Sequence, residues 1–507
     1  NSPCVPISPH LPLSCQYPLP IINYRLPIPN SMRKTKIICT VGPATSTPET
    51  LKALVDAGMN VARLNFSHGD YQFHGKTIEI LRSIPTPPGK PLALMQDLCG
   101  PKIRLGMLPD EGLMVEEGEE VTFVEQEKGN NIHELPLPIP TLFAMVRVGE
   151  PIAINDGRIK LTVIDRGTDK IRALVKIGGK ISSRKGVNLP QTHLPVSSIT
   201  EKDLLDLRFG IQNNLDLVAV SFVRSPADLE PARRAIEAAD KKIRIIAKIE
   251  RREAVENFDE ILKVVYGIMV ARGDLGVEVP LEQVPLIQKD IIRRCNRAGK
   301  PVITATQMLE SMISASDPTR AEVTDVANSV VDGTDAIMLS GETAVGKYPI
   351  AAVQMMDKIA VETEKSLPDG TLQSYGYQAG SLSVTESVAE AVCRMAYEVG
   401  AKAILCHTSS GSTAKLVSKY RPTTPIIALT SEEISYRQLA LSWGVEPLLI
   451  SPASKTEEML IELINTVVEM GIAQEGDKVV ITSGIPVGKP GSTSLIKVHT
   501  IGEAISA

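Results

Sequence analysis

Short apolar runs with the character of buried strands recur along the chain and alternate with amphipathic, helix-like stretches. The strand-like runs cover residues 36–41, 60–65, 92–97, 217–223, 243–249, 267–271, 301–306 and 335–339. The helix-like stretches include residues 47–57, 201–213, 225–239 and 281–298. Eight strand–helix units in this rhythm are typical of a closed (β/α)8 TIM barrel. An open doubly wound sheet is the main structural alternative, and the count of eight favours closure.

Two segments depart from this alternation. Residues 102–195 contain short alternating runs cut by Gly, Pro and Asn-Asp-Gly turns, which predicts an all-β module, a small barrel or sandwich, inserted after the third barrel strand. Because the loops after barrel strands hold the active site, this module would cover the site as a lid. After a helix at 350–366, strand-like runs at 403–407, 426–430, 447–451, 478–482 and 493–501 predict a C-terminal α/β domain, with a first helix at 387–399.

The chain therefore divides into five predicted parts. These are residues 1–31, an extension; 32–101, the first part of the barrel; 102–195, the lid; 196–366, the second part of the barrel; and 367–507, the C-terminal domain. The extension has eight prolines within its first thirty positions. Since proline at that density blocks both helices and central strands, we expect residues 1–31 to be disordered.

Composition excludes several classes of protein. The formal net charge of −5 and the pI near 5.9 oppose a nucleic-acid or acidic-membrane partner, because such partners need a dominant basic face. No apolar run is long enough to predict a membrane-spanning helix. The seven cysteines include no CxxC pair, which is typical of free thiols in a reducing compartment. We therefore expect a cytoplasmic protein in which local charges meet any anionic substrate.

Residues 245–278 place charged side chains at the ends of two successive strand-like runs. The first run delivers Lys248 and Glu250, and the second ends at Arg272, Gly273 and Asp274. Because side chains alternate along a strand, Lys248 and Glu250 lie on one face. Two carboxylates from neighbouring strand ends beside a lysine suit a divalent metal that bridges to a phosphorylated substrate. On this stretch alone, a salt bridge at the barrel rim is the alternative.

The carboxyl ends of the other predicted strands are also polar, and barrels of this kind perform their chemistry there. These ends carry Arg63, Asn65, Ser67 and His68 after the second strand; Asp97 after the third, with Lys102 and Arg104 beyond it; Thr304 and Thr306 after the seventh; and Ser340 and Glu342 after the eighth. The opposite strand ends show no such bias. This asymmetry favours one shared site over a merely solubilising surface.

The order of several long motifs closely resembles the pyruvate kinase family. The motifs are VARLNFSHG, GPKIR, KGVNLP, SFVR, AKIE, MVARGDLG, ATQMLESM, PTRAE and SGETAVGKYP. The resemblance runs from about residue 33 to the end. It implies a homotetrameric enzyme that uses Mg²⁺ or Mn²⁺ to transfer a phosphoryl group from phosphoenolpyruvate to ADP, giving pyruvate and ATP. A metal-dependent barrel lyase acting on pyruvate enolates and a non-catalytic effector sensor are the alternatives.

The resemblance also implies roles for the catalytic residues. Lys248 contacts the phosphoryl group in transfer, while Glu250 and Asp274 hold the divalent metal. Arg63 meets the phosphate of phosphoenolpyruvate, and Thr306 takes part in protonating the enolate. Charge neutralisation of this kind is what phosphoryl transfer requires, because several negative charges gather in one place.

Further residues are implied in binding. The backbone at Ala271, Arg272 and Gly273 receives the substrate carboxylate. His68, Arg104 and the lid residue Lys185 face the nucleotide phosphates.

One motif departs from the family pattern. The common DTKGPEIR is DLCGPKIR in this chain, where Leu98, Cys99 and Lys102 replace Thr, Lys and Glu. In the common form, a monovalent cation, normally potassium, is held by the residues that match Asn65, Ser67, Asp97 and the carbonyl at Leu98. Lys102 brings a fixed positive charge towards that pocket and would stand in for the ion. We therefore expect activity without added potassium.

A hydroxyl-rich loop follows the first strand of the C-terminal domain and precedes a helix. It consists of Thr408, Ser409, Ser410, Gly411, Ser412 and Thr413. Hydroxyls and backbone amides at a helix N-terminus form an anion cradle, although such a turn can equally be a simple helix cap. The loop is similar to the effector-phosphate loop of allosteric members of the family, and residues 483–494 would close over the same site.

Overall fold

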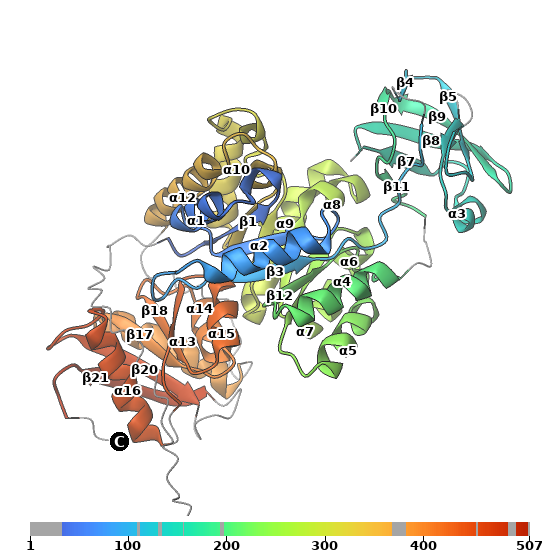
Figure 1. The fold of residues 1–507 in the computed structure, drawn as a ribbon. Coiled ribbons are helices and arrows are strands. Elements are labelled where there is room, and N and C mark those ends of the chain that lie inside the picture. Colours follow the sequence, from blue (N-terminus) through green and yellow to red (C-terminus); the bar gives the residue numbers. More distant parts are fainter. Residues whose placement is uncertain are drawn as a thin grey trace, which may run out of the picture.

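The computed structural model describes residues 33–108, 112–129, 134–155, 157–192, 197–367, 382–452, 455–484 and 493–504, so the predicted extension lies outside the described residues. Eight parallel strands form a closed barrel (Figure 1). They are β1 (Lys36–Val41), β2 (Val61–Asn65), β3 (Ala93–Asp97), β12 (Leu217–Val220), β13 (Arg244–Ile249), β14 (Gly267–Ala271), β15 (Val302–Ala305) and β16 (Ala336–Leu339). Because β1 pairs with both β2 and β16, the predicted closed barrel is confirmed and the open sheet is wrong.

Helices surround the barrel, and some of them begin at a residue whose side chain caps the helix. They are α1 (Pro48–Asp56), α2 (Tyr71–Ser83), α4 (Glu201–Gln212), α5 (Glu230–Ala238), α6 (Arg252–Glu256), α7 (Phe258–Val264), α8 (Arg272–Glu278), α9 (Val284–Ala298), α10 (Arg320–Val331), α11 (Gly341–Ala344) and α12 (Pro349–Ser366). Thr47, Thr200 and Thr319 each accept a backbone N–H from the third residue of the following helix. Such caps satisfy donors that would otherwise be unpaired at a helix start.

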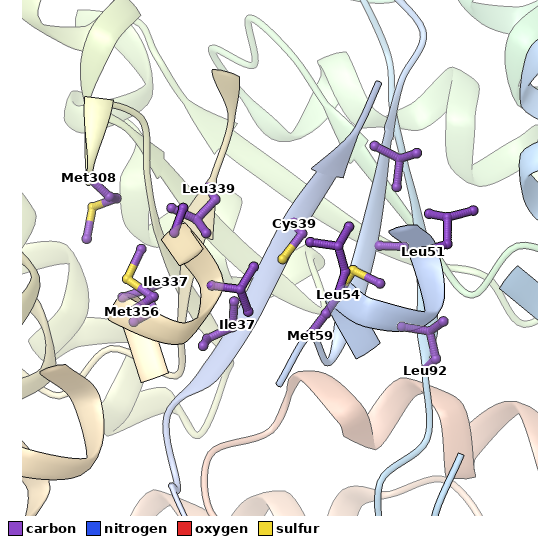
Figure 2. Packing of buried hydrophobic residues seen from close by; sticks show 14 of the residues in the cluster. Ile37, Cys39, Leu51, Leu54, Met59, Leu92, Met308, Ile337, Leu339 and Met356 are labelled. Carbon is purple, nitrogen blue, oxygen red and sulfur yellow. The ribbon is translucent and has the colours of Figure 1, made fainter. Parts of the chain in front are cut away.

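Apolar side chains fill the space between the barrel and its helices. Figure 2 shows Ile37 and Cys39 of β1 with Leu54 of α1 on one side and Ile337 of β16 on the other. All four side chains are fully buried. Burying one such aliphatic side chain contributes about 1.5–3 kcal/mol, so this packing holds the strands as a fixed platform for the charged residues at their carboxyl ends.

The segment between β3 and β12 forms the predicted lid. Its elements are β4 (Leu113–Val115), β5 (Glu120–Val124), β6 (Glu134–Pro136), α3 (Pro140–Met145), β7 (Pro151–Ile154), β8 (Ile159–Arg166), β9 (Lys170–Ile177), β10 (Gly179–Ile181) and β11 (Val187–Asn188). Six strands form one sheet in the order β11-β7-β8-β9-β5-β6, and β10 pairs with β4. The module is therefore not purely β, because a proline starts the short helix α3.

The C-terminal domain has a five-stranded sheet in the order β19-β18-β17-β20-β21. Its elements are α13 (Val384–Glu398), β17 (Ala403–His407), α14 (Ser412–Lys419), β18 (Ile426–Thr430), α15 (Glu433–Gln438), β19 (Val445–Leu449), α16 (Thr456–Glu469), β20 (Lys478–Gly484) and β21 (Thr493–Thr500). The first helix begins earlier than predicted because Ser383 caps it through the N–H of Glu386. The predicted α/β domain is confirmed.

The C-terminal domain contacts the amino ends of the barrel strands, away from the polar strand ends. Arg437 of α15 pairs with Asp216, which directly precedes β12, at 2.7 Å. Arg421 pairs with Asp335, which directly precedes β16, at 3.1 Å. Lys36, the first residue of β1, donates a hydrogen bond to the carbonyl of Val445. Of the helices within the described ranges, none is long and apolar enough to cross a membrane.

Candidate active site

Lys248 lies at the centre of the polar cluster at the carboxyl ends of the strands. Its neighbours along β13, Ala247 and Ile249, pack outwards against the helices, so Lys248 takes the inward face together with Ile246. The ammonium is 2.7 Å from Glu250 Oε1 and donates a 2.7 Å hydrogen bond to a serine of the β12 end. Burial lowers the pKa of Lys248, but the surrounding carboxylates outweigh burial and raise that pKa above its ordinary value. The lysine therefore stays charged at neutral pH.

Asp97 holds two cations in place from the end of β3. Its Oδ1 lies 3.3 Å from Lys248 Nζ, and its Oδ2 accepts a 2.6 Å hydrogen bond from Arg63 Nε. Burial raises the pKa of Asp97, yet the charges of Arg63 and Lys248 outweigh burial and keep it below its usual value. Arg63 also donates to Thr40 Oγ1 at 2.9 Å. The structure thus brings the predicted Arg63 and Lys248 together around one ionised carboxylate.

Glu250 and Asp274 provide a second, more negative part of the cluster. Glu250 is 1% exposed, and its Oε2 accepts the backbone N–H of Phe222 at 2.8 Å. Burial raises the pKa of Glu250; Lys248 opposes this effect, and the negative charge of Asp274 adds to it. Two neighbouring carboxylates with unfavourable mutual repulsion fit a bound divalent cation.

The number of protein ligands also fits magnesium. Mg²⁺ is usually bound through one or two carboxylates together with water and substrate phosphates. The pair formed by Glu250 and Asp274 matches that pattern.

Thr306 occupies a strained backbone conformation after β15. Its φ is +68°, which is rare for a β-branched residue, and such strain typically costs about 1–3 kcal/mol and clusters at functional sites. The Thr306 hydroxyl accepts the N–H of Gly273 at 2.9 Å and donates to the carbonyl of Ala305 at 2.6 Å. The loop at Thr306 therefore meets the predicted carboxylate-binding backbone at the start of α8.

Arg272 stabilises this loop through its side chain. Its guanidinium donates to the carbonyls of Ala305 and Thr306, at 3.2 and 2.7 Å, and pairs with Asp325 of α10 at 2.7 Å. Two other polar residues of the strand ends have structural partners. Thr304 donates to a buried threonine hydroxyl, and Glu342 accepts the backbone N–H groups of Leu309 and Ser340.

The predicted nucleotide residues gather where the lid joins the barrel. Arg104 pairs with Gly186 in an isolated antiparallel bridge, and the carbonyl of the exposed Lys185 accepts the N–H of Leu105. His68 lies close enough to Arg104 for the charge of Arg104 to affect it. Burial lowers the pKa of His68, and the charge of Arg104 lowers that pKa further. Positive charge on both sides of the connection favours an anionic ligand between lid and barrel.

Lys102 lies in the first lid connection and reaches the carboxylate pair. Its Nζ is 3.8 Å from Asp274 Oδ1, and its Cε packs against Gly186, where an added Cβ would be 3.1 Å away. A hollow beside this connection is lined by Lys102, Asn188 and Arg251, among others. The lysine of the variant motif therefore places its charge next to the proposed metal ligands.

Three of the residues matched to the potassium site, Asn65, Asp97 and Leu98, already accept hydrogen bonds from the protein. The Leu98 carbonyl accepts the Ser221 hydroxyl at 2.7 Å, and Asn65 Oδ1 accepts the N–H of Ser67 at 3.1 Å. Asp97 forms ion pairs with the side chains of Arg63 and Lys248.

Sequence reasoning missed two residues that position this site. Ser221 connects the Leu98 carbonyl to the Lys248 ammonium, and Thr40 orients Arg63. Ser221 is the first residue of the SFVR motif, at the end of a strand. That position is only a weak indication that Ser221 takes part in the site. Nothing in the sequence around Thr40 distinguishes it from an ordinary strand residue.

The hydroxyl-rich loop of the C-terminal domain leads into α14, but the helix begins earlier than predicted, because Ser412 and Thr413 are its first two residues. Gly411 caps the helix with a φ of +78°, and an added Cβ there would approach Leu439 to 3.1 Å. Ser410 donates to Ser412, and Thr413 Oγ1 lies 2.8 Å from the hydroxyl of Thr493. The loop therefore meets the start of β21, while residues 485–492 of the predicted closing segment lie outside the described residues.

Comparison with known proteins gives the same result over most of the chain. Residues 32–353 match the family model described as pyruvate kinase, barrel domain, and residues 386–499 match pyruvate kinase, alpha/beta domain. A pyruvate kinase of Geobacillus stearothermophilus is 45% identical over 477 residues, covering 94% of this chain and 81% of that protein. A pyruvate kinase of Sporosarcina psychrophila is 44% identical over 479 residues, covering 94% and 82%. With these matches, its closed barrel and its C-terminal α/β domain, the chain belongs to the pyruvate kinase family and is a phosphotransferase.

Proposed function

We propose that this enzyme transfers the phosphoryl group of phosphoenolpyruvate to ADP, giving pyruvate and ATP. The observation that supports this best is the charged Lys248 ammonium, held between Asp97 and Glu250 with Arg63 on the far side of Asp97. Such a cluster offers fixed positive charge to a transferring phosphoryl group. In phosphoryl transfer, positioning and electrostatic stabilisation supply most of the catalysis.

The proposed role of each side chain follows from its charge and its position. Arg63 binds the phosphate of phosphoenolpyruvate, and Lys248 stabilises the phosphoryl group in transfer. Lys248 does not supply the proton that the enolate needs, because its raised pKa keeps it charged. The hydroxyl of Thr306 faces the start of α8 and relays that proton through water. Glu250 and Asp274 would hold Mg²⁺ or Mn²⁺, which when bound neutralises charge on the phosphoryl oxygens.

Substrate dependence tests this function. Pyruvate formation is expected only when phosphoenolpyruvate and ADP are both present, and ATP should form in equal amount. Consumption of phosphoenolpyruvate without ADP would contradict the proposal and favour another chemistry at the same barrel end. We also propose a cytoplasmic homotetramer, with domain boundaries at residues 31, 101, 195 and 366.

Turnover is expected without added potassium, because Lys102 supplies a fixed positive charge 3.8 Å from Asp274. The measurement compares initial rates in a tetramethylammonium buffer with and without potassium. Lys102→Glu is the informative variant, since it restores the glutamate of the common motif and should make the rate depend on potassium. A wild-type rate that is negligible until potassium is added would contradict this prediction.

Ser410→Asp is expected to abolish activation by phosphorylated effectors, because a carboxylate in the half-buried loop would repel the effector phosphate. Ser410→Ala is the matched control and should weaken activation much less. Activation curves with several sugar phosphates and nucleotides provide the measurement. Undiminished activation of the aspartate variant would show that the effector binds elsewhere.

A further inference from the structure

The two proposed metal ligands lie just beyond the point where their strands stop pairing with each other. The last paired residues of β13 and β14 are Ile249 and Val270. Glu250 directly follows Ile249, and Asp274 lies in the first turn of α8, the helix that follows β14. The hydrogen-bond ladder between these two strands therefore does not set the separation of the two carboxylates, and side chains beyond the strand ends have to do so.

The two carboxylates differ in how firmly they are held. Glu250 accepts the backbone N–H of Phe222 at 2.8 Å and pairs with Lys248 at 2.7 Å. The Asp274 side chain is 27% exposed, and its ion pair with Lys102, at 3.8 Å, is too long for a hydrogen bond. The direction of the Asp274 carboxylate therefore depends on how α8 is held.

An ion pair between Arg251 and Glu278 holds α8 at its far end. Glu278 is the last residue of α8 and lies four positions after Asp274, so the two side chains share one face of the helix. The Glu278 side chain is fully buried, and its Oε1 lies 3.2 Å from Arg251 Nη1. Arg251 directly follows Glu250 in the chain. The pair thus connects the segment that carries one metal ligand to the helix that carries the other.

The charges around Glu278 make this contact depend on the arginine. Burial raises the pKa of Glu278 to about 7, and the charges of Glu253 and Asp274 contribute in the same direction. Arg251 and the side chain of the lid residue Asn188 act in the opposite direction. Within the described residues, Arg251 is the only cation that forms an ion pair with Glu278. Its removal would leave a buried carboxylate without a counter-charge.

We propose that Arg251 is a positioning residue for the divalent metal, because through Glu278 it holds α8 so that the Asp274 carboxylate faces Glu250. This inference rests on the metal ligands assigned under the proposed function. Groups that fix a metal ligand in its direction typically contribute about 10–100-fold to metal affinity. Arg251 therefore acts on the metal through the helix, without being a ligand itself.

The affinity of the full-length enzyme for Mn²⁺ alone tests this role. Electron paramagnetic resonance measures free Mn²⁺ at about pH 8, under argon, where Glu278 is mostly ionised. Arg251→Met is expected to raise the Kd for Mn²⁺ by about tenfold or more. The direction of the change is decisive, because loss of a positive charge near two carboxylates would by itself tighten Mn²⁺ binding.

Arg252→Met is the matched control. Arg252 is the next residue in the chain, but it is exposed and pairs with Glu256 of its own helix at 3.0 Å. This variant should bind Mn²⁺ as the wild type does. Arg251→Lys keeps a cation opposite Glu278 and should recover most of the affinity that Arg251→Met loses. Circular dichroism checks folding, and Arg251→Gln replaces Arg251→Met, with the same expected direction, if the latter does not fold.

Glu250→Gln separates the positioning role from the assignment of the ligands. This variant should bind Mn²⁺ weakly. Equal binding by Glu250→Gln and the wild type would show that the assigned metal ligands are wrong, and the inference with them. Weak binding by Glu250→Gln, together with unchanged or tighter binding by a folded Arg251→Met, would overturn the positioning role alone. None of these readouts depends on pyruvate formation.

Discussion

Lys248→Met is expected to lower kcat for pyruvate formation by about 10³-fold or more, the scale that one transition-state cation reaches in phosphoryl transfer. Methionine is nearly isosteric with lysine, but it leaves Asp97 and Glu250 without the ammonium that they share. Because Lys248 acts mainly on charge that develops during transfer, kcat should fall more than the KM for phosphoenolpyruvate changes. The measurement is a steady-state assay in which both substrates are varied.

Lys36→Met is the matched control for this loss. Lys36 is also a buried barrel lysine, at 7% exposure, but it lies at the opposite strand end and donates to a carbonyl of the C-terminal domain. The control should keep kcat close to wild type. Near-ultraviolet circular dichroism establishes that both variants are folded. A folded Lys248→Met enzyme with wild-type kcat would refute the assigned role.

Asp216→Ala is expected to destabilise the protein by about 3 kcal/mol or more, because it removes a buried carboxylate that binds two arginines and leaves a buried backbone N–H without its acceptor. Asp216 is fully buried and pairs with Arg82 of α2 at 2.8 Å and with Arg437 of α15 at 2.7 Å. It also accepts the backbone N–H of Leu94 at 2.7 Å. One carboxylate thus joins two barrel strands, a barrel helix and the C-terminal domain. The midpoint of urea-induced unfolding provides the measurement.

Asp290→Ala provides the comparison for that prediction. Asp290 pairs with Arg293 and Arg294 on the solvent-facing side of α9, and ion pairs of that kind contribute about 0.2–1 kcal/mol. Its unfolding midpoint should therefore stay near wild type. Equal shifts for the two variants would show that the buried network around Asp216 does not hold the domains together.

The barrel strands could be predicted closely because each is a short, fully buried run bounded by turn residues. The sequence predicted residues 36–41 and 267–271, and β1 and β14 occupy those residues. The prediction for β19 was displaced by two residues, since the apolar run after Gly444 continues beyond the last paired residue. Strand ends are set by pairing partners, which a local pattern does not specify.

The side-chain contacts of the site were less predictable than its position. Lys248, Glu250 and Asp97 could be placed at strand ends from alternation alone. The side chain of Arg272, in contrast, turns to Asp325, which is 53 residues further along the chain. Ser221 likewise gains its role from Leu98, 123 residues away. Hydrogen bonds between such distant segments leave no local pattern in the sequence.

The pairing of the two lid connections has a consequence for the charge of the site. Because Arg104 and Gly186 form a bridge, the segments that enter and leave the lid are held together at this point. Lys102 belongs to the first segment, and its ammonium reaches Asp274 in the described position. A dissolved cation enters a site by diffusion and leaves in the same way. The Lys102 ammonium, in contrast, is a covalent part of the first lid connection, so its position depends on that segment and not on the cation concentration of the solution.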